Sequence, residues 1–148
     1  MVTTRIRRSS ADDLDTLVGL GREYCAADGH VFDEATVRSG FAGVVADDTY
    51  GAVLVAEVEA TVVGYAVMSW GWSIEIGGLD VVLDEIYVRP KGRGVGGRLL
   101  AAVEALCRDV GAKRVFLETE PGNERARRWY AANGFETQPS IWMSKELG

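Results

Sequence analysis

The chain has 148 residues, with 22 acidic and 16 basic side chains and a formal net charge of -6. This length predicts one domain, residues 1–148, which can bury about two thirds of the surface that its unfolded chain exposes. The acidic balance argues against nucleic acid as a partner, because nucleic-acid binding requires a basic surface.

Cysteine and histidine are too few and too scattered to predict a metal site or a disulfide. Cys25, Cys107 and His30 are the whole set, and none of them has a neighbour at ligand spacing. No apolar run approaches the roughly eighteen residues that a membrane span needs, and the N-terminus lacks the apolar core of a signal peptide. We therefore expect a cytoplasmic protein with no metal and no membrane partner.

The first third of the chain predicts a short strand and two helices. Residues 5–8 favour a short edge strand. Ser10 and Asp13 have the spacing of a capping box, and the apolar residues that follow recur at helical intervals, which predicts a helix over residues 11–27. A second helix with an apolar stripe is predicted from Asp33 to near residue 47.

The middle of the chain changes to short runs rich in β-branched residues. Residues 53–58 and 62–70 predict a hairpin, and Gly77 and Gly78 turn the chain into a third strand over residues 79–88. These three strands are expected to run antiparallel to one another.

The last third predicts a crossover and a final helix. Apolar residues between Leu99 and Val110 recur every three or four positions, and Gly111 ends that helix. A strand over residues 113–120 follows the helical crossover, so it should run parallel to the strand before the helix.

Asn123 begins the final helix and Asn133 with Gly134 ends it, after which residues 135–147 predict one or two closing strands. The predicted fold class is therefore mixed α/β, with one central sheet and four flanking helices.

A glycine-rich loop connects residue 88 to the helix that contains Leu99. A loop between a strand and a helix N-terminus directs several unpaired backbone N–H groups to one point, and the helix dipole adds positive charge there. An anion with several oxygens fits that point, so we expect the loop to hold a pyrophosphate.

Two classes of nucleotide site are less consistent with this loop. Residues 92–97 satisfy the dinucleotide pattern GxGxxG, and Glu118 lies where a ribose-binding acid is expected. However, a dinucleotide fold begins with this unit, whereas here three antiparallel strands precede it, which disfavours a nicotinamide cofactor. No Gly-Lys-Ser or Gly-Lys-Thr is present, which excludes a Walker loop.

The order of elements, with the segments IYVRPKGRGVGGRLL and NERARRWYAANGF, resembles the Gcn5-related N-acetyltransferase (GNAT) family. The resemblance extends from Arg5 to Leu147. It implies the acyl-CoA N-acyltransferase fold, a mostly antiparallel sheet of six to seven strands with one splayed parallel pair and four helices. It also implies acetyl-CoA as the cofactor.

In that family the loop follows the pattern Arg or Gln, two residues, Gly, one residue, Gly or Ala. Lys91 matches the first position, with Gly94 and Gly96 as the two glycines, although the family has Arg or Gln there. An alternative register begins at Arg93 and keeps Gly96. The residues that the resemblance implies for cofactor binding are Ile86, Tyr87, Val88, Lys91, Arg93, Gly94, Val95, Gly96, Gly97, Arg98, Asn123, Ala126 and Tyr130.

The resemblance also implies the catalytic groups. Tyr130 matches the tyrosine that protonates the leaving thiolate, and its ordinary pKa of about 10 keeps it protonated at neutral pH. Glu85 is the first candidate for a general base, Glu118 the second and Glu75 the third, although a neutral amine needs none. Strand alternation directs Asp84 to the face opposite Glu85, unless a bulge shifts the register.

The expected activity is acetyl transfer by direct attack of a primary amine, with a small cationic molecule as acceptor and a peptide amine as the alternative. Tyr24, Trp70, Trp72 and Glu75 are candidates for the acceptor pocket, although aromatic residues at these spacings more often belong to an ordinary core. The alternative function is a non-catalytic acyl-CoA sensor or interaction module. Many relatives form dimers, so the resemblance allows a homodimer.

Overall fold

A computed structural model describes residues 3–89 and 94–148 of the chain. The chain forms two compact units, Met1–Leu117 and Glu118–Gly148. The first unit contains the sheet and three helices, and the second contains the last helix and the C-terminal segment. That residues 1–148 act as one domain stays a prediction.

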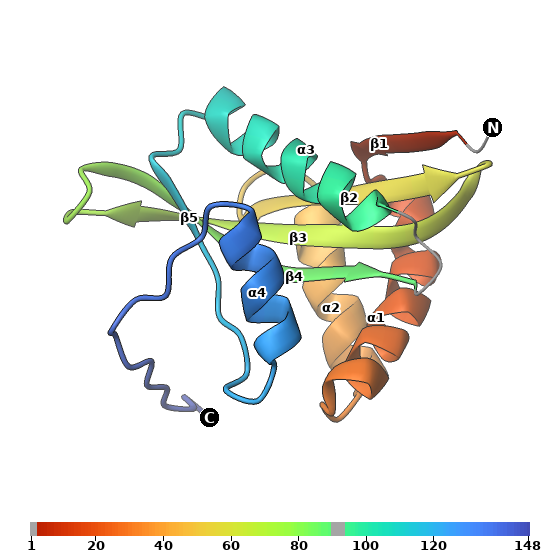
Figure 1. The fold of residues 1–148 in the computed structure, drawn as a ribbon. Helices are drawn as coiled ribbons and strands as arrows, with labels where there is room; N and C mark the ends of the chain where they lie inside the picture. The colour runs from red at the N-terminus through yellow and green to blue at the C-terminus, as the bar shows by residue number, and fades with distance from the viewer. Residues whose placement is uncertain (1–2, 90–93) are drawn as a thin grey trace. The chain divides into compact units, whose positions relative to one another are not determined.

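The sheet of the first unit has five strands among the described residues, in the spatial order β1-β2-β3-β4-β5 (Figure 1). Neighbours are antiparallel from β1 to β4, and β5 runs parallel to β4. The strands are β1 (Thr4–Arg8), β2 (Gly51–Val58), β3 (Thr61–Ser73), β4 (Gly78–Val88) and β5 (Arg114–Phe116). The predicted antiparallel strands and the parallel crossover are confirmed, and this topology differs from the parallel sheet of a dinucleotide fold.

The predicted number of six to seven strands is wrong for the described residues. Strand β5 covers three residues instead of 113–120, and residues 135–147 contain no strand. Ile141, Trp142 and Met143 suggested a strand, but these side chains are largely exposed. A run with high β-propensity forms a strand only where a neighbouring edge accepts its hydrogen bonds, and a single sequence does not reveal that edge.

Four α-helices lie in the described part of the chain, in agreement with the predicted number. The carboxylate of Asp13 accepts a hydrogen bond of 2.8 Å from the backbone N–H of Ser10, which forms the predicted capping box ahead of the first helix. The helices are α1 (Leu14–Asp28), α2 (Glu34–Val45), α3 (Val95–Asp109) and α4 (Glu124–Ala132), and a short 3-10 turn, Ala11–Asp13, precedes α1.

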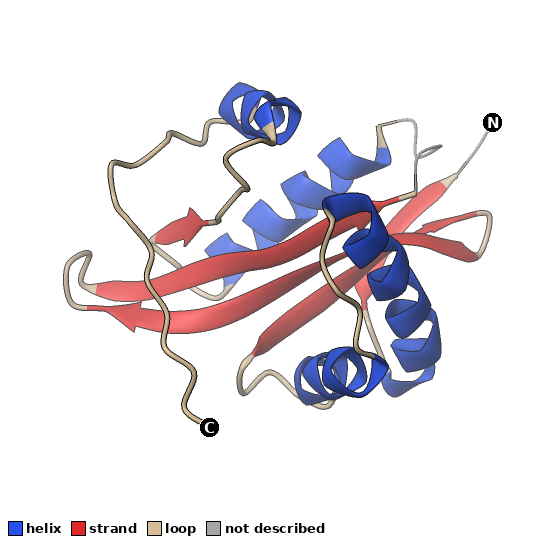
Figure 2. Ribbon diagram, turned by 90° about the horizontal axis from the view of Figure 1, so that it is seen from below, coloured by secondary structure: helices blue, strands red, loops and turns tan. Residues whose placement is uncertain are grey.

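Helices cover both faces of the sheet (Figure 2). Side chains alternate across a strand, so Val53 and Val55 of β2 pack on one face with Leu17 of α1 and Phe41 of α2. Helix α3 contributes buried apolar residues, Leu99 among them, and packs against β2, β3 and β4. Within residues 3–89 and 94–148, no helix is both long enough and apolar enough to cross a membrane.

Candidate active site

A β-bulge lies in β4 at two neighbouring acidic residues. Across the β3–β4 pair, Val67 lies opposite Glu85 and Met68 lies opposite Leu83, so Asp84 is the extra residue. An extra residue interrupts strict alternation and turns neighbouring side chains toward one side. The sequence allowed either strict alternation, with Asp84 and Glu85 on opposite faces, or a bulge that shifts the register. The structure has the bulge, and both side chains line one cleft.

This cleft lies between α2 and the strands β3 and β4, and it has a volume of about 420 Å³. Helix α2 supplies one wall, which is mainly apolar, and the strands supply the polar end. Both charged residues on its lining are acids. The lining residues are Thr36, Val37, Gly40, Phe41, Val44, Val67, Ser69, Asp84 and Glu85.

The carboxylate of Glu85 is held by a buried tyrosine. The hydroxyl of Tyr65 donates a hydrogen bond of 2.7 Å to Oε1 of Glu85. Burial raises the pKa of Glu85, the Tyr65 hydroxyl lowers it, and the nearby Asp84 charge raises it again. Burial also raises the pKa of Tyr65, so its hydroxyl stays protonated as a donor. Glu85 is thus a fixed carboxylate that is more basic than an ordinary glutamate.

Asp84 has a different partner within the same cleft. Its carboxylate accepts a hydrogen bond from the hydroxyl of Ser69 on β3. Burial raises the pKa of Asp84, while the Ser69 hydroxyl lowers it. The two carboxylates are therefore anchored separately, and both can face a cation in the cleft.

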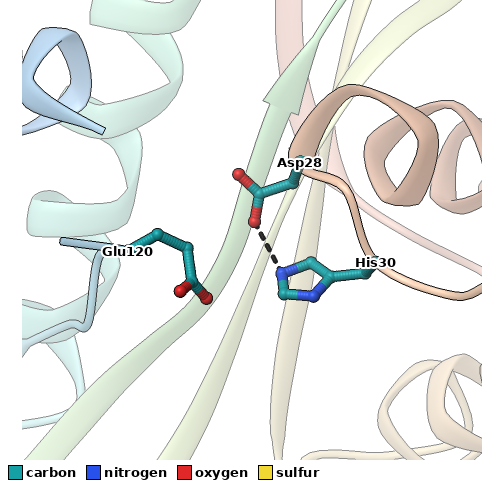
Figure 3. A group of neighbouring side chains, drawn as sticks. All are labelled: Asp28, His30 and Glu120. Atoms are coloured by element: carbon teal, nitrogen blue, oxygen red, sulfur yellow. Dashed lines mark ion pairs between the residues drawn. The ribbon is translucent and has the colours of Figure 1, made fainter. Parts of the chain in front are cut away.

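Asp28 is the last residue of α1 and His30 follows it closely, so both belong to the first unit, as the cleft does. Nε2 of His30 lies 2.7 Å from Oδ2 of Asp28 (Figure 3). The rings of Tyr24 and His30 stack with centroids 6.2 Å apart. The charges of Asp28 and His30 act on the pKa of Glu85 in opposite directions, Asp28 raising it and His30 lowering it. Figure 3 also draws Glu120, which belongs to the second unit.

The C-terminal half of β4 has an open edge among the described residues. Strand β5 pairs with β4 only at residues 80–82, whereas β3 pairs with β4 as far as Val88. The N–H of Arg89 donates to the carbonyl of Val63 on β3 at 2.9 Å. Because backbone groups alternate in direction along a strand, those of Ile86 and Val88 face the open edge. An extended ligand could pair there.

The N-terminus of α3 follows directly on the glycine loop. Gly94, at the N-cap, has φ of 83°, a left-handed conformation that favours glycine. The first bond within the helix joins the N–H of Arg98 to the carbonyl of Gly94 at 3.2 Å. The N–H groups of residues 95–97 precede that bond, as expected for an anion site. Lys91 and Arg93, which distinguish the two loop registers, lie outside the described residues.

In the second unit, α4 carries the candidate acid. Oδ1 of Asn123 accepts a hydrogen bond of 3.1 Å from the N–H of Ala126, which confirms the predicted helix cap. The ring of Tyr130 lies with its centroid 5.0 Å from that of Trp129 and 5.6 Å from that of Phe135. Tyr130 is thus held on α4 by aromatic neighbours.

The other candidate residues lie at several separate places. Glu118 is exposed and follows the end of β5 by two residues, rather than ending a long strand. Nε1 of Trp70 donates to the backbone carbonyl of Asp48 at 2.8 Å. Trp72 is 75% exposed, and Glu75 is exposed in the turn between β3 and β4. None of these, nor Tyr24, is among the residues that line the cleft.

The sequence did not predict that α2 forms a wall of the cleft. Val37, Phe41 and Val44 were expected only as the apolar stripe of a packed helix. A signal was available at Gly40, because a glycine within a helix is unfavourable by about 0.5–1 kcal/mol relative to alanine and so often marks a need for space.

Comparison with known proteins identifies relatives of this fold. The model of the acetyltransferase (GNAT) family matches residues 18–135. An uncharacterised N-acetyltransferase of Mycobacterium bovis is 34% identical over 107 residues, which cover 71% of this chain and 65% of the relative. The chain thus spans just under two thirds of the length of that curated relative.

Two solved structures share the fold over nearly the whole chain. An integron cassette protein from the mobile metagenome of Cole Harbour Salt Marsh has a TM-score of 0.84 and 26% identity, covering 97% of this chain and 90% of its own. An aminoglycoside N-acetyltransferase in complex with CoA has a TM-score of 0.83 and 20% identity, covering 100% and 97%. At 20% identity the second likeness concerns the fold alone.

Proposed function

Because the chain belongs to the acetyltransferase (GNAT) family, we propose that it transfers an acetyl group from acetyl-CoA to a primary amine. The observation that carries this proposal is the position of Glu85, a half-buried and oriented carboxylate immediately before the open edge of β4. A proton acceptor and an edge that can hold an extended acyl carrier thus lie on adjacent residues.

The proposed cofactor contacts follow from the backbone of the first unit. The open-edge groups of Ile86 and Val88 would pair with the pantetheine arm, and the N–H groups of Val95, Gly96 and Gly97 in the first turn of α3 would bind the pyrophosphate. The aminoglycoside N-acetyltransferase with the same fold is in complex with CoA, which supports this choice of cofactor. Cofactor contacts of four further residues stay predictions: Tyr87, Arg98, Asn123 and Ala126. The choice between Lys91 and Arg93 as the first residue of the loop motif also stays a prediction.

The proposed reaction is direct attack in a ternary complex. The amine nitrogen forms a bond to the thioester carbonyl carbon, and the C–S bond breaks. Glu85 takes the proton that the amine loses, and Tyr130 gives a proton to the departing sulfur. A backbone N–H at the open edge would stabilise the oxyanion, a contribution of about 3 kcal/mol in comparable sites. Glu118 remains the second candidate for the base.

The acceptor is proposed to be a small cationic amine, because the cleft that Glu85 lines carries two acids. A peptide amine is the alternative acceptor. Cytoplasmic location, the homodimer and the expected absence of metal, membrane and nucleic-acid partners stay predictions.

The test is release of free CoA thiol from acetyl-CoA in the presence of a panel of primary amines. We expect amine-dependent release by the wild-type chain and a large loss of release in Glu85→Gln. Calorimetry with acetyl-CoA and with NADH accompanies the assay. Binding of acetyl-CoA without release for any amine would favour the sensor function, and binding of NADH alone would overturn the proposal.

A further inference from the structure

The cleft between α2 and strands β3 and β4 combines one acidic end with apolar walls, and this combination selects among amines. We propose that its occupant is a primary amine with a single positive charge and an apolar, aromatic or branched aliphatic, substituent, and that Gly40 provides the room for that substituent. The inference rests on the proposed function, since this amine would be the acetyl acceptor.

The charge of the cleft is confined to one place. Asp84 and Glu85 are consecutive residues of β4, and they are the charged members of the lining. Asp28, whose charge also reaches Glu85, is paired with His30 at 2.7 Å. One ammonium group between the two carboxylates could donate hydrogen bonds to both, and its positive charge is opposite in sign to theirs.

Apart from the hydroxyls of Thr36 and Ser69, the rest of the lining is apolar and unsuited to further charges. Val37, Phe41 and Val44 come from α2, and Val67 comes from β3 beside the acids. A second ammonium or a set of hydroxyl groups placed against these side chains would lose water without gaining hydrogen bonds, which is unfavourable. An aliphatic or aromatic group would instead remove apolar surface from water. Polyamines and aminoglycosides thus fit the cleft less well than a monocation.

Gly40 determines how much room the α2 wall leaves. A Cβ atom built on Gly40 would meet no described atom within 4 Å, so a larger side chain there can extend into the cleft without a backbone clash. Gly43, on the same helix, is equally open by this measure but does not line the cleft. The two glycines therefore form a matched pair, because a substitution at either one has the same effect on helix propensity.

The experiment measures binding and turnover with four amines: 2-phenylethylamine, ethylamine, spermidine and kanamycin. Calorimetry on the full chain gives the affinities without depending on catalysis, and CoA release gives kcat/KM. The wild-type chain should bind 2-phenylethylamine at least tenfold more tightly than spermidine or kanamycin. Gly40→Leu should lower the ratio of 2-phenylethylamine to ethylamine affinity at least tenfold, while Gly43→Leu keeps that ratio.

The outcomes separate this inference from the proposed function. Tighter binding of spermidine or kanamycin, or equal effects of Gly40→Leu and Gly43→Leu, would overturn the inference even if acetyl transfer occurs. Selective binding of 2-phenylethylamine that Gly40→Leu weakens, without CoA release for any amine, would support the cleft's ligand class and overturn the proposed transfer reaction.

Discussion

Tyr65 and Glu85 face one another from the adjacent strands β3 and β4, and the tyrosine hydroxyl donates to the carboxylate at 2.7 Å. Tyr65 is fully buried, and its ring also packs against Phe41 with centroids 5.2 Å apart. The same side chain thus joins the core to the acidic end of the cleft. Tyr65 is a positioning residue for the proposed base.

Replacing Tyr65 with Phe should change the pH dependence of the reaction. The lost hydroxyl lowers the pKa of Glu85 in the wild type, so its removal lets burial raise that pKa further. Less of the carboxylate is then ionised at a given acidic pH, and the acidic limb of kcat/KM should move to higher pH. Tyr50→Phe, at an exposed tyrosine, is the control. An acidic limb that does not move would contradict the role of Tyr65.

Gly94→Ala should weaken the binding of acetyl-CoA. The left-handed conformation of Gly94, with φ of 83°, orients the first N–H groups of α3, and a side chain there introduces strain of about 1 kcal/mol. Gly111, beyond the other end of α3, has φ of 81°, so Gly111→Ala imposes the same strain away from the loop. Calorimetry should detect a several-fold loss of affinity for Gly94→Ala alone. Equal losses would indicate a general effect on stability.

Tyr130→Phe tests the proposed general acid. The ring should keep its contacts with Trp129 and Phe135, so α4 and the affinity for acetyl-CoA should change little. Without the hydroxyl, the leaving sulfur departs as an unprotonated thiolate, and kcat should fall several-fold. Steady-state kinetics and calorimetry on the same preparation provide the two measurements. An unaltered kcat would remove Tyr130 from the mechanism.

Asp13→Asn should destabilise the fold by about 1–3 kcal/mol at neutral pH, because it breaks a buried charged hydrogen-bond network. Both carboxylate oxygens of Asp13 accept hydrogen bonds of 2.8 Å from Arg7, and Asp13 is only 6% exposed. Urea denaturation measures the free energy of unfolding. Asp15→Asn is the control, since the Asp15 side chain is 90% exposed and should contribute little.

The effect of Asp13→Asn should also depend on pH. Arg7 lowers the pKa of Asp13 in the folded state below its ordinary value. The stabilisation is therefore complete above the unfolded pKa of about 3.9 and is lost as the pH falls through the lower folded pKa. The difference between wild type and variant should shrink in strongly acidic urea titrations. A constant difference would contradict this assignment.

The sequence predicted best the features that depend on near neighbours. The Ser10–Asp13 capping box joins residues three positions apart, and Asn123 caps α4 through Ala126 in the same way. Such contacts need only local geometry, so residue type and spacing are sufficient. The helices and the antiparallel strands follow from periodicity for the same reason.

Features that depend on distant partners could not be predicted in the same way. Which side Asp84 faces depends on the register between β3 and β4, and the sequence of β4 alone does not give that register. The expected closing strands at residues 135–147 required a neighbouring edge. The part that Gly40 plays in the cleft depends on how α2 packs over two strands that are far away in the sequence.

The bulge at Asp84 also determines which residues of β4 direct their backbone N–H and C=O groups toward the β5 side. Before it, the carbonyl of the odd-numbered Leu79 accepts a hydrogen bond of 2.8 Å from Lys113 at the start of β5, so odd positions face β5. After it, the even-numbered Ile86 and Val88 face that side. One inserted residue thus lets a single strand pair with β5 and then offer a different set of backbone groups to a ligand. Deletion of Asp84 would remove the bulge and leave Glu85 opposite Val67, so Ile86 and Val88 would keep facing that side while Asp84 is lost from the cleft.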